Sequence, residues 1–172
     1  MECDNLGELP FFKGFETSQL NLIQRFCEIS TFSNEVTIFQ QGDHATNLYI
    51  LIEGEVAIYF KPCDGPPMMI KKIEPGEGFG WSAVLQRLRY NAAAVTTAET
   101  RVIQINSKNL KKIYSLDPDT GWHLLNQMAG FMKDRSQINQ EKLFQLFSDE
   151  IKIKTNPRKR KNKDGTKKQF HA

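Results

Sequence analysis

The middle of the chain contains the stretch Pro75-Gly-Glu-Gly-Phe-Gly-Trp-Ser-Ala-Val-Leu-Gln-Arg-Leu-Arg-Tyr-Asn-Ala-Ala-Ala-Val95. Its three glycines, Gly76, Gly78 and Gly80, allow the backbone to turn tightly and to come close to a ligand. The run from Ser82 to Leu88 favours a short helix, and the first amide N–H groups of a helix attract an anion. The stretch therefore predicts a phosphate-binding turn, with a plain connection between two elements as the alternative.

Short strands are expected on both sides of this stretch. β-branched and aromatic runs alternate with turns such as Gln41-Gly42-Asp43 and Glu53-Gly54-Glu55, and no long helix interrupts them between Ser30 and Ile105. This texture is typical of an antiparallel jelly roll or barrel, which can enclose a small ligand. The expected strands are residues 35–39, 48–52, 56–60, 68–73, 92–98 and 100–105.

Helices are expected before and after the strands. Thr17 is a candidate N-cap for a helix over residues 18–28, whose apolar stripe would pack in the core. Ser107 is a candidate N-cap for a helix over residues 108–115. A longer helix is expected from Asp117 to about Phe147, because a proline and acidic residues stand at its start. Its wide apolar stripe favours packing on the domain and on a partner helix together.

These segments together resemble the cyclic nucleotide-binding domain family, which includes catabolite activator-like proteins and cAMP-binding regulatory domains. Phe79-Gly80, followed by Ser82–Leu85 and Ala92–Val95, is similar to the family's phosphate-binding cassette. Residues 48–56 are similar to its two central strands and their glycine turn. The resemblance covers about residues 6–147, and it implies a mainly β jelly roll (a β-roll) with an N-terminal helix and a long C-terminal helix.

The resemblance implies a site for a cyclic nucleotide, cAMP or cGMP, or for another phosphate-bearing small molecule. Trp81 stands where the family has the glutamate that binds the ribose 2′-hydroxyl, and an indole only donates hydrogen bonds. The family's phosphate-pairing arginine falls on Arg89, Tyr90 or Asn91, depending on the length of the loop. Arg89 is the expected counter-ion, since a guanidinium pairs with phosphate in a bidentate manner. The candidate ligand-binding residues are Phe79, Gly80, Trp81, Ser82, Ala83, Arg89, Tyr90, Asn91 and Ala92.

The expected function is that of a regulatory, ligand-sensing module that signals through its C-terminal helix. In the resembled family this helix commonly dimerises, so a homodimer through residues 119–147 is expected. Two alternatives stay open. One is a catabolite activator-like transcription regulator without a helix-turn-helix domain, since the 25 residues after Phe147 are too few for one. The other is a degenerate module that binds no ligand, in which Trp81 fills the space of the ribose.

The composition argues against an enzyme. Three histidines lie in a turn, a helix and the C-terminal segment, so they predict no metal cluster, and no nucleophile–base set is recognisable. No cofactor is expected. Three widely spaced cysteines without a CxxC motif favour a reducing, cytoplasmic location. These residues are His44, His123, His171, Cys3, Cys27 and Cys63.

A basic segment follows the expected domain. We expect residues 1–148 to form the domain and residues 149–172 to form a disordered tail. Residues 151–172 carry nine Lys or Arg and one acid, a net charge of +8, so the rest of the chain carries −5 of the total of +3. Such a tail could contact nucleic acid without sequence preference or an acidic partner, or could simply keep the protein in solution. No apolar run approaches the ~20 residues of a membrane span, and no secretory signal is visible.

Overall fold

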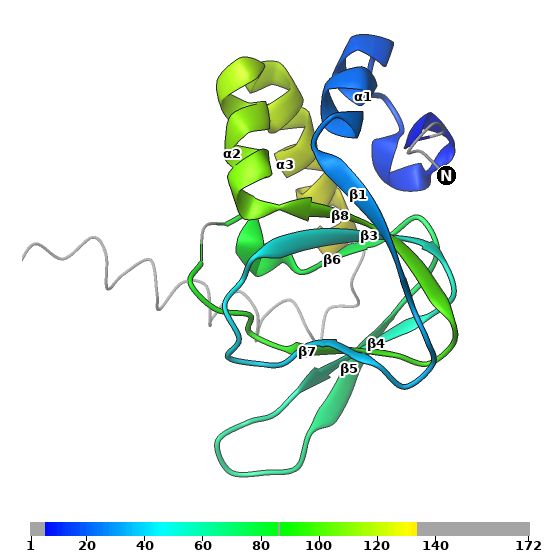
Figure 1. Cartoon of the computed structure of the whole chain (residues 1–172). Coiled ribbons are helices and arrows are strands. Elements are labelled where there is room, and N and C mark those ends of the chain that lie inside the picture. Colours follow the sequence, from blue (N-terminus) through cyan, green and yellow to red (C-terminus); the bar gives the residue numbers. More distant parts are fainter. Residues whose placement is uncertain (1–5, 86, 134–172) are drawn as a thin grey trace, which may run out of the picture. The chain divides into compact units, whose positions relative to one another are not determined.

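Two antiparallel sheets face each other across the centre of the domain, and helices cover one of them (Figure 1). The computed structural model describes residues 6–85 and 87–133. One sheet has the strand order β1-β8-β3-β6 and the other the order β2-β7-β4-β5, which confirms the predicted jelly roll. The strands are β1 (Cys27–Phe32), β2 (Thr37–Phe39), β3 (Asn47–Glu53), β4 (Val56–Phe60), β5 (Met68–Ile73), β6 (Gly78–Phe79), β7 (Ala93–Thr96) and β8 (Thr100–Asn106).

The alternation of side chains along β3 divides the core into two clusters. Leu48 and Ile50 point to the side of the helices, whereas Tyr49 and Leu51 point between the sheets. All four are buried, so β3 is apolar on both faces, as a central strand has to be. We call the second cluster, between the two sheets, the roll interior. Its buried members are Phe39, Tyr49, Leu51, Val56, Ile73, Phe79, Tyr90, Ala94 and Val102.

The helices lie on the outer face of the β1-β8-β3-β6 sheet (Figure 1). Two short 3₁₀ turns, η1 (Leu6–Glu8) and η2 (Pro10–Phe12), precede α1 (Thr17–Gln24), and α2 (Ser107–Leu116) and α3 (Pro118–Lys133) follow the strands. Buried residues of these elements, among them Phe11, Ile23, Leu110 and Leu124, pack with Leu48 and Ile50 on the helical side of the sheet. These residues form the first cluster, which is the outer core of the domain. Among the described residues, no helix has the length and apolar character needed to cross a membrane.

Several predicted boundaries were wrong. The first helix ends at Gln24 and not at Glu28, because Cys27 and Glu28 pair with Ile105 and Gln104 of β8. The caps also differ by one residue: Glu16 caps α1 in a reciprocal capping box with Gln19, and Asn106, whose side chain accepts from the Lys108 amide, caps α2. Local pattern cannot anticipate such pairing, since it depends on residues far along the chain.

The predicted helix over residues 82–88 is also wrong. Only a 3₁₀ turn, η3 (Trp81–Ala83), forms there, and the two-residue strand β6 before it was not predicted. The long helix is described as far as Lys133. Its expected continuation to Phe147, the domain end at residue 148 and the basic segment lie outside the described residues.

Candidate functional site

The glycine turn of the predicted cassette is held tightly against β3. Gly80 has φ +80°, and a Cβ atom there would lie 2.8 Å from the Asn47 carbonyl oxygen and 3.0 Å from the Tyr49 ring. Only glycine adopts this conformation in this space without strain. Ser82 and Ala83 follow, both buried, and the Ala83 amide donates to the Gly80 carbonyl oxygen at 3.1 Å. The amides of Trp81 and Ser82 come before this bond, at the start of the turn.

Trp81 lies on the helical side of the sheet and not in the roll interior. Its ring stacks on Phe11 of η2, with the ring centroids 6.3 Å apart and an interplanar angle of 27°. It packs against the first cluster, and a Cβ on Gly78 would come within 2.6 Å of it. Its Nε1 atom is buried without a hydrogen-bond partner among the described residues. Trp81 therefore fills a place in the outer core, on the helical side of the sheet.

Tyr90 takes the place in the roll interior next to the cassette. The side chain is 4% exposed, and its ring stacks on Phe39 with the centroids 3.8 Å apart and an interplanar angle of 15°. Its hydroxyl donates to the Asn47 carbonyl oxygen at 2.8 Å and accepts from the Asn47 amide at 2.9 Å. Burial is the main reason that the pKa of Tyr90 rises from 10.0 to about 12, so the side chain is neutral near neutral pH.

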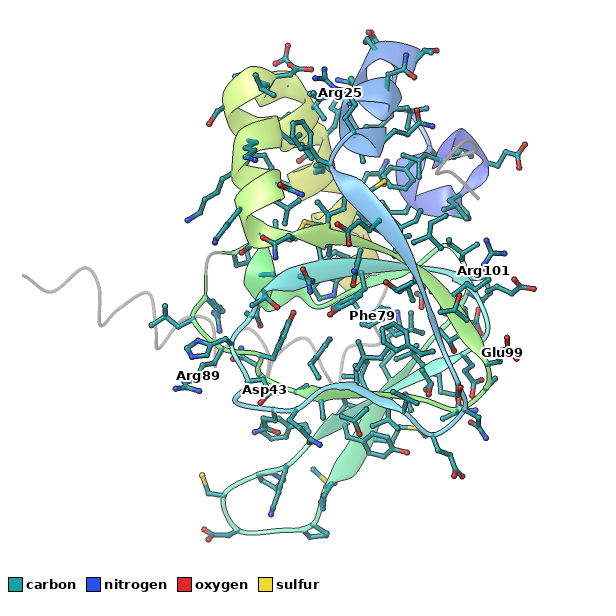
Figure 2. The ribbon with its side chains drawn as sticks, in the orientation of Figure 1. Arg25, Asp43, Phe79, Arg89, Glu99 and Arg101 are labelled. Atoms are coloured by element: carbon teal, nitrogen blue, oxygen red, sulfur yellow. The ribbon has the colours of Figure 1, made fainter. Side chains whose placement is uncertain are left out.

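Four aromatic rings fill this part of the roll interior. Phe39 also stacks on Tyr49 and Phe79, at centroid distances of 5.8 and 6.2 Å, and the last two rings stack on each other at 5.0 Å. We call Phe39, Tyr49, Phe79 and Tyr90 the aromatic stack; every member is at most 7% exposed. Figure 2 shows the position of Phe79 between the two sheets. In this conformation the aromatic stack occupies the space that faces the cassette.

Arg89 lies at the rim of the roll. Its side chain is exposed, and a guanidinium nitrogen donates to the Gly42 carbonyl oxygen at 2.5 Å. The segment around Arg89 pairs with the turn before β3. Arg89 and His44 form an isolated antiparallel β-bridge, and the Tyr90 amide donates to the Asp43 carbonyl oxygen at 2.9 Å. Figure 2 shows Arg89 beside Asp43, outside the space between the sheets.

The nine predicted site residues thus separate into four places, one of which is that of Trp81 on the helical side of the sheet. Phe79 and Tyr90 meet in the roll interior, and Gly80, Ser82 and Ala83 form the turn beside it. Arg89 and Asn91 are exposed at the rim, while Ala92, half-buried, leads into β7. Within the described part of the chain, no hydrogen bond joins the Arg89 side chain to residues 80–83. No group of three or more His, Cys, Asp or Glu able to hold a metal occurs among the described residues.

Asn47 is a site residue that the sequence reasoning missed. Besides its two main-chain bonds to Tyr90, its side chain donates to the Tyr49 hydroxyl at 3.3 Å and accepts from the Asn106 side chain at 3.2 Å. Alternation along β3 was a usable signal that Tyr49 points inward with Leu51. No local pattern singles out Asn47, since its partners Tyr90 and Asn106 lie in the segment before β7 and at the end of β8.

A family model for the cyclic nucleotide-binding domain matches residues 29–117, from β1 to the first residue after α2. The chain belongs to this family. The cAMP-activated global transcriptional regulator CRP of Pasteurella multocida (strain Pm70) is 26% identical over 112 residues, which are 64% of this chain and 54% of that protein. The chain therefore spans about half the length of the curated relatives it matches.

Two solved structures of this family's fold superpose on most of the chain. A candidate cyclic nucleotide-binding protein from Geobacter metallireducens GS-15 gives a TM-score of 0.63 at 27% identity, covering 71% of this chain and 88% of that one. The catabolite activator protein of Thermus thermophilus gives a TM-score of 0.65 at 21% identity, covering 80% of this chain and 62% of that one. Together with the family match, these show that the chain has the fold of a cyclic nucleotide-binding domain.

Proposed function

We propose that this domain is a regulatory module that senses a phosphate-bearing small molecule, with cAMP and cGMP as the first candidates, and that signals through its C-terminal helix. The observation that carries the proposal is the position of Tyr90. It comes from the loop after the cassette, yet its ring closes the roll interior next to the Gly80 turn. A ligand that enters the roll beside this turn has to displace Tyr90, and a binding event is thereby converted into a loop movement.

The ligand's anionic group would bind at the turn after Gly80. The amides of Trp81 and Ser82 start that turn, where first amides lack an intrahelical partner. Arg89 would supply the counter-charge after leaving the Gly42 carbonyl oxygen, and the same loop movement that releases Tyr90 would bring it there. Family membership supports this reading, since the activator matched here from Pasteurella multocida is named as cAMP-activated.

A second candidate function is an interaction module that binds no ligand. The aromatic stack favours it, because four buried rings already fill the space and Trp81, in place of an acceptor for the ribose, packs on Phe11. Such a domain would act only through its surface. The names of the relatives also support a further proposal, regulation of transcription as by a catabolite activator. Three expectations stay predictions: the homodimer through residues 119–147, the partners of the basic segment and the cytoplasmic location.

Calorimetric titration with cAMP and then cGMP separates the first two candidates. The wild-type protein is compared with Tyr90→Ala, which frees the space of the ring, after circular dichroism has confirmed that the variant is folded. Saturable binding that tightens in Tyr90→Ala supports a sensing module gated by Tyr90. Absence of heat and of any change in melting temperature at millimolar ligand, in both proteins, would exclude cAMP and cGMP as ligands and would move the search to other anionic metabolites or protein partners.

Arg89 is tested in the same assay. Arg89→Ala should abolish binding of the phosphate ligand, because the phosphate then loses its counter-charge. Arg25→Ala is the matched control: Arg25 is also exposed, and its guanidinium lies 6.0 Å from the centre of the Phe26 ring, far along the chain from the cassette. Unchanged affinity in Arg89→Ala would remove Arg89 from the site.

A further inference from the structure

A cavity lies where β1, β8 and β3 meet the start of α2, and Asn47 is the one residue of its lining that also belongs to the site described above. It has a volume of about 470 Å³, within the usual range of small-molecule sites. Its lining includes residues from the first turn of α2. Figure 1 shows α2 beside the sheet that carries the helices. Its lining is polar apart from one aromatic ring: Phe26, Glu28, Asn47, Gln104, Asn106, Lys108, Asn109 and Lys112.

Strand register explains why polar groups gather on this wall. Gln104 stands directly opposite Glu28 on one side and opposite Tyr49 on the other, so the three side chains share one face of the sheet. Asn47 and Asn106 form the next pair at the end of the same strands. Tyr49 on this face belongs to the aromatic stack. The other positions of the same face carry the carboxylate of Glu28 and the amides of Gln104, Asn47 and Asn106.

The amide groups are held in place by hydrogen bonds. Gln104 Nε2 donates to a Glu28 carboxylate oxygen at 3.2 Å, and Asn106 Nδ2 donates to Asn47 Oδ1 at 3.2 Å. Asn109 Nδ2 donates to the Phe26 carbonyl oxygen at 3.1 Å. A wall whose polar groups are already oriented costs less conformational entropy when a ligand binds.

Two ammonium groups also line this cavity. Lys108 and Lys112 are four residues apart on α2 and so lie on the same face of the helix. Among the described residues neither forms an ion pair; Lys112 Nζ lies 5.9 Å from the centre of the Phe26 ring. With Glu28, the cavity holds two positive charges and one negative charge.

We propose that this cavity binds a small organic acid that also carries a hydroxyl or amino group. The two lysines would bind the acid's carboxylate, since charge-assisted bonds to carboxylate are the strong ones. Glu28 would accept from the hydroxyl or amino group with the carboxylate oxygen that Gln104 does not use. The amides of Asn47 and Asn109 can serve as donors or acceptors for the rest of the molecule.

The probe is L-malate, and succinate, which lacks only the hydroxyl group, is the matched comparison. Each is titrated into isotope-labelled full-length protein at constant ionic strength, and the side-chain amide signals of Asn47, Gln104 and Asn109 are followed by NMR. We expect saturable shifts of these signals with malate, and about tenfold weaker binding of succinate, because a hydrogen bond to a charged group is lost. Equal affinities for the two acids would overturn the role of Glu28.

Variants of α2 test the lysines. Lys112→Gln should weaken malate binding about tenfold or more, because a charge-assisted hydrogen bond is lost. Lys111→Gln removes the same charge from the neighbouring exposed position and should leave the affinity unchanged. Shifts that never saturate, or that weaken equally in both variants, would show general charge screening and overturn the site. Asn47 also bonds to Tyr90, so the decisive readouts are the signals of Gln104 and Asn109 and the two lysine variants, all of them outside the cassette and its bonds to Asn47. Their result is read separately from the outcome of the cAMP titration.

Discussion

The hydroxyl of Tyr90 is bonded on two sides to the main chain of Asn47, as donor to the carbonyl oxygen at 2.8 Å and as acceptor from the amide at 2.9 Å. The side chain of Asn47 continues the network to Tyr49 and to Asn106, the N-cap of α2. One residue at the start of β3 therefore connects the loop after the cassette, the aromatic stack and the first turn of α2.

The first prediction concerns these two hydrogen bonds of the Tyr90 hydroxyl. Tyr90→Phe keeps the ring in the aromatic stack and removes the hydroxyl, so both Asn47 groups lose a partner. We expect the free energy of unfolding to fall by about 1–3 kcal/mol. Tyr59→Phe is the control, since its hydroxyl bonds to no described residue, and its effect should stay within about 0.5 kcal/mol. Urea denaturation monitored by circular dichroism measures both variants. Equal free energies of unfolding for the wild type and Tyr90→Phe would mean that the two hydrogen bonds are replaced without cost.

The second prediction is a loss of stability at high pH. Burial raises the pKa of Tyr90 from 10.0 to about 12, and it raises the pKa of Tyr114 to about 12 as well. Between these values the unfolded chain has lost protons that the folded chain still holds, so stability is complete below pH 10 and falls as the pH rises towards 12. Each such tyrosine contributes about 1.4 kcal/mol per pH unit to the slope.

The measurement is the free energy of unfolding across this pH window, together with phenolate absorbance. Tyr90→Phe should remove one of the late-titrating groups and flatten the slope by about 1.4 kcal/mol per pH unit. A slope that is the same in the wild type and in Tyr90→Phe would show that the Tyr90 hydroxyl titrates alike in the folded and unfolded chains.

The third prediction separates backbone strain from close approach at the cassette turn. Gly80→Ala places a Cβ 2.8 Å from the Asn47 carbonyl oxygen at φ +80°, whereas Gly14→Ala has a similar φ of +91° and no atom within 4 Å. Strain alone should cost about 1–2 kcal/mol in Gly14→Ala. Gly80→Ala should cost clearly more and should disturb the NMR signals of Asn47 and Tyr49. Equal losses of stability would mean that the turn moves away from β3 without resistance.

The fourth prediction concerns the two tryptophans. Trp81→Ala removes a ring that packs on Phe11 and the first cluster, so it should lower the free energy of unfolding by about 2–4 kcal/mol. Trp122→Ala, on α3, removes a ring that is 62% exposed and should cost less than about 1 kcal/mol in the monomer. Circular dichroism is the suitable readout, since each variant loses one of the chain's two tryptophans.

A large effect of Trp122→Ala that depends on protein concentration would instead support the helix-mediated homodimer. A small effect of Trp81→Ala would show that the place of Trp81 in the outer core is not needed for stability, and would reopen the interpretation of this residue as part of the ligand site.

Much of the β-roll could be predicted because its signals are local. The strands β4 and β5 begin and end as expected, and β2, β3, β7 and β8 are within two residues of the predicted ranges. The elements that were missed depend on pairing at a distance. Cys27 joins β1 because Ile105 lies opposite, and Gly78 joins β6 because Ile50 does.

The sequence by itself determined the fold, the place of the glycine turn and the departure from the family at Trp81. Alternating apolar residues and turn residues carry that information within a few positions. Only the tertiary structure decided where three neighbouring side chains of the site lie: Trp81 on the helical side, Arg89 at the rim and Tyr90 in the roll interior. The physical reason is that each side chain lies where a packing or hydrogen-bond partner is available. These partners, Phe11 for Trp81, Gly42 for Arg89 and Asn47 for Tyr90, come from distant parts of the chain and reach the site only when it folds.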